Sequence, residues 1–134
     1  MSVQGPFKVN FHEVFPHGLL AVGAVQPMAD FDASTREKKV QARDRDTGIP
    51  IYTFDAMDCD PEARERTFKV KIVADQEPVL PAAIPGAPVR PVVLEGLTVT
   101  PYLKDVGNGR QRIAYSLRAT GLAAPGRQGE AKAA

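Results

Sequence analysis

The sequence predicts a small all-β domain, a barrel of five or six strands with a long proline-rich crossover and little helix. Three observations support this fold class. Short segments alternate apolar and polar residues, turn signals rich in glycine separate several of them, and prolines gather in one connection. Alternation with a period of two is typical of strands that have one face in a core. Many short strands without long helical segments favour a closed or nearly closed barrel over a doubly wound sheet.

The first predicted strands lie between residues 18 and 73. Residues 18–25 form a short apolar run whose glycines indicate a bend in the strand. Residues 39–45 and 49–57 flank a turn signal and predict a hairpin. Residues 67–73 alternate cleanly, so that Phe68, Val70 and Ile72 share one face and Thr67, Lys69 and Lys71 share the other.

A proline-rich connection separates these strands from a last hairpin. Five of the twelve prolines lie in residues 76–91, which predicts an extended crossover that is too long for a hairpin loop. Residues 92–102 and 112–119 alternate on either side of a turn at 106–109. The Gly- and Ala-rich end of the chain, from Gly121, has no period and is expected to be disordered. We therefore expect an N-terminal segment at 1–16, a barrel domain at 17–122 and a disordered tail at 123–134.

Composition and charge narrow the class of protein. The chain has 134 residues, 43% of them hydrophobic, which suits one globular domain. It has no apolar run of membrane-spanning length, no secretory signal pattern and one cysteine, Cys59, so we expect a cytoplasmic protein without a disulfide. The formal net charge is +1, but residues 101–134 hold six basic and two acidic side chains. Positive charge is therefore concentrated on the last hairpin and the tail, where it can act locally on phosphates.

Two groups of residues are candidates for contact with a polyanion. The first lies on the central strands: a Gln-x-Arg-x-Arg series and a Lys-x-Lys series, with two aromatic residues between them. The second is the basic tip of the last hairpin, which can reach around a strand of nucleic acid. Cations hold phosphates, and exposed rings stack on unpaired bases at about 1–3 kcal/mol per base. The candidate nucleic-acid-binding residues are Gln41, Arg43, Arg45, Tyr52, Phe54, Lys69, Lys71, Lys104, Arg110 and Arg112.

The same residues also allow a structural interpretation. Tyr52 and Phe54 share a face, which is either the core face or the outer face, because one sequence does not fix the register. If both rings point inward, the cations form an ordinary solvated exterior. Tyr102 and Tyr115 are expected as cross-strand neighbours whose main role is packing.

The chain shows no recognisable catalytic or cofactor motif. Its acidic residues and its two histidines, His12 and His17, do not have the spacing of a zinc or calcium site. It has no phosphate-binding glycine loop and no serine in a nucleophile motif. We expect no enzyme activity, no metal, no cofactor and no small-molecule substrate.

Several sequence blocks carry a family resemblance. Residues 40–48 (VQARDRDTG), a Tyr/Phe strand, residues 92–102 (VVLEGLTVTPY) and residues 114–119 (AYSLRA) together resemble plasmid replication, integration and excision activators of actinobacterial integrative plasmids. The pattern over residues 17–122 is also similar to the oligonucleotide-binding (OB) fold of phage- and plasmid-type single-stranded DNA-binding proteins. The resemblance implies an OB-type barrel in which Tyr52 and Phe54 contact bases and the strand cations contact phosphates. The low net charge, the absence of tryptophan and the lack of an acidic, aromatic-ended tail depart from that family's pattern.

We therefore expect a non-catalytic single-stranded DNA-binding protein of a mobile genetic element, which acts in plasmid replication, integration or excision. The alternative is a regulatory protein–protein interaction module of the same element that does not bind nucleic acid directly. A homodimer is compatible with both, because small barrels pair through strand edges. The DNA-binding hypothesis requires cations from separate strands to meet in one groove lined by rings, whereas buried rings beside a mixed-charge exterior would favour the alternative.

Overall fold

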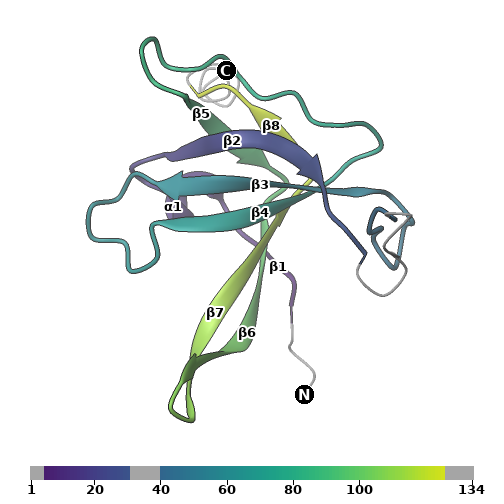
Figure 1. Ribbon diagram of the computed structural model, residues 1–134, viewed down its shortest axis with the longest axis vertical. Coiled ribbons are helices and arrows are strands. Elements are labelled where there is room, and N and C mark those ends of the chain that lie inside the picture. The colour runs from purple at the N-terminus through teal and green to yellow at the C-terminus, as the bar shows by residue number, and fades with distance from the viewer. Residues whose placement is uncertain (1–4, 31–39, 126–134) are drawn as a thin grey trace.

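The computed structural model describes residues 5–30 and 40–125. It is an all-β fold in which eight strands form one curled sheet in the order β1-β6-β7-β4-β3-β2-β5-β8 (Figure 1). The elements are β1 (Phe7–Lys8), α1 (Phe11–Val14), β2 (Leu19–Pro27), β3 (Ile51–Asp58), β4 (Thr67–Val73), β5 (Val89–Glu95), β6 (Thr98–Gly107), β7 (Arg110–Ala119) and β8 (Gly121–Ala123).

The curl of the sheet follows from its connections. Every strand pair is antiparallel except β4 and β7, which run parallel. β5 and β6 are separated in the chain by Gly96 and Leu97 alone, yet they lie near opposite ends of the strand order. The bend at these two residues therefore brings the ends of the strand order together and gives the sheet the shape of a half-barrel.

Alternating side chains of the central strands build the core. The largest buried side chains are Leu19 of β2, Phe54 of β3, Val70 and Ile72 of β4, and Val92 of β5. In the register of β3 and β4, Phe54 lies opposite Val70, so both point to the inside of the curl. The outward positions between them are left for polar side chains, as the period of two requires.

The N-terminal segment is part of this core. Asn10 caps α1 by accepting a hydrogen bond from the backbone N–H of His12, and Phe11 and Phe15 are buried. The ring of Phe15 stacks on Phe68 of β4 at a centroid distance of 5.9 Å. Phe11 and Phe15 therefore belong to the same core as the strands.

The hairpin of β6 and β7 projects away from the other strands (Figure 1). We call its projecting part, residues 101–115, the arm. Its loop is Asn108-Gly109, and both residues have positive φ, 54° and 71°. Positive φ at both central residues is the requirement of a type I′ turn, whose twist matches that of the flanking strands.

Three features differ from the sequence prediction. The structure has eight strands instead of five or six, partly because Gly96 divides the predicted strand at 92–102 into β5 and β6. Residues 40–45 form no strand, only two isolated bridges, Ala29 with Gln41 and Arg43 with Pro50. The chain after Gly121 forms β8 against β5 instead of being disordered from that point. The rest of the predicted tail, residues 126–134, lies outside the described residues.

Candidate nucleic-acid interface

Outward-facing side chains of β4, β7 and β6 share one surface. In the parallel pair of β4 and β7, Lys71 lies opposite Arg118, and Arg118 lies opposite Thr98 of β6. Directly opposite residues point to the same side of a sheet. The register thus places cations of two strands side by side, although 47 positions separate them in the sequence.

This surface is hollowed into a groove of about 690 Å³, which we call the cationic groove. Four cationic side chains line it, two from β4 and one each from β6 and β7. Two tyrosine rings border it, and Tyr102 is 47% exposed. The lining residues are Pro6, Glu65, Thr67, Phe68, Lys69, Lys71, Thr98, Thr100, Tyr102, Lys104, Tyr115, Ser116 and Arg118.

Acidic side chains offset part of the charge in the cationic groove. Lys69 Nζ lies 3.1 Å from Asp55 Oδ1, and both side chains are exposed. Lys104 Nζ lies 3.6 Å from Glu65 Oε1. Within residues 5–30 and 40–125, Lys71 forms no ion pair, so its ammonium is the groove's uncompensated charge.

Asp44 connects the segment before β3 to the groove. Its carboxylate accepts hydrogen bonds from the backbone N–H and the hydroxyl of Thr47, and its Oδ1 lies 2.7 Å from Arg118 Nη1. Hydrogen bonding to the Thr47 side chain is the main cause that lowers the pKa of Asp44, and Arg118 lowers it further against the opposing effect of desolvation. This ion pair fastens residues 40–50 to the end of β7.

The predicted residues of the 40–45 segment do not line the groove. Gln41 donates a hydrogen bond from Nε2 to the carbonyl oxygen of Ile51 and is partly buried, so it has a structural role. Arg43 donates to the carbonyl oxygen of Gly48, and Arg45 lies exposed in the following turn. The missing residue in the prediction was Asp44, which sits between these arginines and binds Arg118.

The two rings expected to stack on bases point inward. Phe54 is 2% exposed and lies in the core, which leaves no ring face open to a base. Tyr52 packs against the same core from the next inward position of β3. The base-stacking role predicted for Phe54 is therefore wrong, and Tyr52 does not face the cationic groove. The inward orientation that the alternation also allowed is the one observed.

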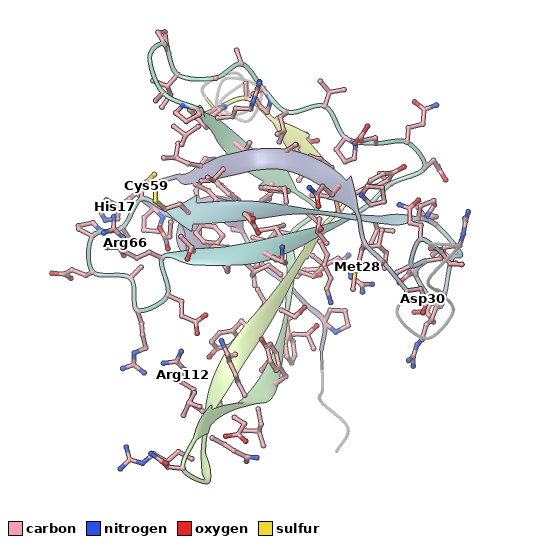
Figure 2. The ribbon with its side chains drawn as sticks, in the orientation of Figure 1. His17, Met28, Asp30, Cys59, Arg66 and Arg112 are labelled. Carbon is pink, nitrogen blue, oxygen red and sulfur yellow. The ribbon has the colours of Figure 1, made fainter. Side chains whose placement is uncertain are left out.

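Of the three basic residues predicted on the last hairpin, one lines the cationic groove and two do not. Lys104 lines the cationic groove, whereas its cross-strand partner Arg112 lies on the arm (Figure 2). Arg112 donates a hydrogen bond to Glu65. Arg110 is exposed beside the turn. Sequence reasoning missed Arg118 and Tyr102 as groove residues, although Arg118 shares a face with the predicted Arg112 in the alternation of residues 112–119.

No second chemical centre emerges in the part of the chain that the structure describes. It contains no group of three or more His, Cys, Asp and Glu side chains that could hold a metal ion. Burial is the main cause that raises the pKa of the Cys59 thiol, with a further increase from Asp58 that Arg66 opposes. A thiol with a raised pKa is a poor nucleophile at neutral pH. None of the helices in the described residues is long and apolar enough to cross a membrane.

Comparisons with protein-family models, with curated proteins and with solved structures found no match to this chain.

Proposed function

We propose that this protein binds single-stranded DNA, without catalysis, in the cationic groove. The observation that carries the proposal is the convergence of Lys69, Lys71, Lys104 and Arg118, from three strands, in one groove bordered by an exposed tyrosine ring. Ammonium and guanidinium groups bind phosphates, and the open face of Tyr102 offers a surface for an unpaired base. The resemblance of residues 40–48, 92–102 and 114–119 to plasmid replication, integration and excision activators is the reason for placing this activity in a mobile genetic element.

The proposal extends to the fold, which we assign to the OB type. In an OB barrel the face of the second and third strands and the neighbouring loops bind the oligonucleotide. If β2 is counted as the first strand, that face is the outer side of β3 and β4, where Lys69 and Lys71 lie. With β5 and β6 counted together as a fourth strand that bends at Gly96, the loop between the fourth and fifth strands is the tip of the arm. The parallel pairing of β4 with β7 within an otherwise antiparallel curled sheet supports this assignment.

A salt titration tests the proposed function. Fluorescence anisotropy of a labelled oligonucleotide measures the association constant at several salt concentrations. The logarithm of this constant should fall linearly with the logarithm of the salt concentration, with a slope near −0.7 per phosphate contact and so about −3 for four cations. Lys71→Glu should lower affinity about tenfold, or about 1.4 kcal/mol, and flatten the slope. Arg66→Glu is the matched control, because Arg66 lies beside Cys59 and His17 and does not line the groove, although its chain neighbours Glu65 and Thr67 do (Figure 2). Undetectable binding, salt-independent binding or equal losses in both variants would overturn the proposal.

A second candidate function is a regulatory protein-interaction module. The burial of Tyr52 and Phe54 beside an exterior of mixed charge favours this alternative. It predicts that a partner protein is retained by the immobilised chain after nuclease treatment and that Lys71→Glu does not alter oligonucleotide binding. The titration above therefore separates the two candidates.

A further inference from the structure

The arm carries an apolar surface on the side opposite the Lys104–Arg112 pair. Pro101 lies opposite Tyr115 and Leu103 lies opposite Ile113 on this side, which we call the apolar arm face. The exposed fractions are 66% for Leu103, 60% for Ile113 and 63% for Tyr115. A ribbon of two strands is only marginally stable by itself, and a group of large exposed apolar side chains marks an interaction surface.

The apolar arm face runs into a groove at the open end of the half-barrel. This groove has a volume of about 550 Å³, and its apolar lining includes Val14, Phe15, Phe68 and Val99, together with Ile113 and Tyr115 from the arm. We call it the apolar groove. Because the two surfaces share Ile113 and Tyr115, a projecting ridge and a recess of the same apolar character lie next to each other on one molecule.

We propose that two copies of this chain form a dimer in which each apolar arm face docks in the apolar groove of the other copy. A ridge beside a matching recess is self-complementary under a twofold axis, which is the commonest symmetry of homo-oligomers. Each copy then contributes both surfaces, and only such a reciprocal arrangement allows a narrow ribbon to approach the roughly 800 Å² per partner of a standard interface.

Two charged side chains without ion pairs, one on each surface, support the same partner. Asp105 follows Leu103 on the apolar arm face, near the tip, and lies opposite Gln111. Arg64 lines the apolar groove together with Asp58, Glu65 and Arg112. Across the described chain neither Asp105 nor Arg64 forms an ion pair. Antiparallel docking of two copies brings Asp105 of one copy to Arg64 of the other, so the surface is complementary in charge to itself. The two grooves share Glu65, Phe68 and Tyr115, whereas Lys71, Lys104 and Arg118 line the cationic groove and not the apolar groove.

Sedimentation equilibrium tests the dimer and its arrangement. Wild-type protein should approach twice the 14.5 kDa chain mass at micromolar concentrations. Ile113→Glu should shift the protein to monomer, whereas Val79→Glu, at a residue that is 86% exposed on the proline-rich crossover, should leave the dimer intact. Far-UV circular dichroism checks that each variant folds. A monomeric wild-type protein, or a dimer that survives Ile113→Glu, would overturn the proposal.

A charge exchange tests the pairing of Asp105 with Arg64. Asp105→Arg and Arg64→Asp should each weaken the dimer about tenfold, and the double variant should recover most of the lost affinity. Failure of the double variant to recover would overturn the reciprocal arrangement. Both results are independent of oligonucleotide binding, so they stand or fall separately from the proposed function.

Discussion

Asp44 shows how a single side chain contacts both its own turn and a cation of the groove. Its carboxylate accepts hydrogen bonds from Thr47 within its own turn and pairs with Arg118 on β7. The same contact that fixes residues 40–50 also neutralises one of the four groove cations. Asp44 therefore links its turn to β7 and at the same time lowers the net positive charge of the groove.

We predict that Asp44→Asn lowers stability at pH 7 and increases oligonucleotide affinity several-fold. The folded-state pKa of Asp44 is lowered, so its contribution to stability is present above the ordinary aspartate pKa of about 3.9 and is lost as pH falls through the folded value. The difference in melting temperature between wild type and variant should thus shrink on acidification from pH 7 to pH 2. Asp46→Asn, in the same turn, is the control. A difference that grows at low pH would contradict this account.

At the scale of elements, the bend between β5 and β6 determines how the sheet curls. Gly96 has a φ of +62°, a conformation that L side chains rarely adopt. A Cβ added there would collide with the hydroxyl of Thr120, whose backbone N–H and hydroxyl both donate to the carbonyl oxygen of Glu95. Thr120, which lies between β7 and β8, therefore stabilises the bend by hydrogen bonds to the residue before Gly96.

We predict that Gly96→Ala destabilises the protein by more than the roughly 1–2 kcal/mol that left-handed backbone alone costs. Gly109→Ala is the matched control, because Gly109 has a similar φ of +71° but nothing within 4 Å of an added Cβ. Urea denaturation followed by circular dichroism gives both free energies of unfolding. Adding Thr120→Ala to Gly96→Ala should reduce the loss toward that of the control. Equal losses in the two single variants would show that Thr120 does not crowd the bend.

The elements that the sequence predicted well are those with uninterrupted alternation. The predicted strand at 67–73 coincides with β4, and the bend expected from the glycines of residues 18–25 matches the positive φ of Gly23 and the register shift in β2. The segment 40–45 alternates equally well but forms no strand. Its side chains bond to distant groups instead: Gln41 donates to the carbonyl oxygen of Ile51, and Asp44 pairs with Arg118. Alternation is a local signal, and these contacts connect distant parts of the chain.

For the whole molecule, three of the seven predicted cations line the cationic groove, whereas neither Tyr52 nor Phe54 does. Lys69, Lys71 and Lys104 do line one groove, but the groove needs β4 and β7 to be neighbours, and parallel pairing between distant strands leaves no mark in a single sequence. The rings were misassigned for the same reason, since only the register decides that Phe54 faces Val70 and not the solvent. Side-chain alternation defines two faces and does not say which is inside.

The whole molecule also divides into parts of unequal stability, which hydrogen exchange can measure. β3 has a hydrogen-bonded strand on each side and contributes to the core. In the projecting arm, the two strands are hydrogen-bonded to each other alone, and few side chains are buried. Local opening requires less free energy where fewer apolar contacts must be broken. In dilute protein we therefore expect amides of residues 101–113 to exchange at least about tenfold faster than those of β3.

The same measurement at high protein concentration connects the arm to self-association. If two copies dock through their apolar arm faces, protection of residues 101–113 should increase with concentration in the wild type and stay low in Ile113→Glu. Protection of β3 should change in neither protein, because its hydrogen bonds are already complete within one chain. An arm as strongly protected as β3 in dilute solution would mean that the half-barrel itself stabilises the arm, and the argument for a marginal ribbon would fail.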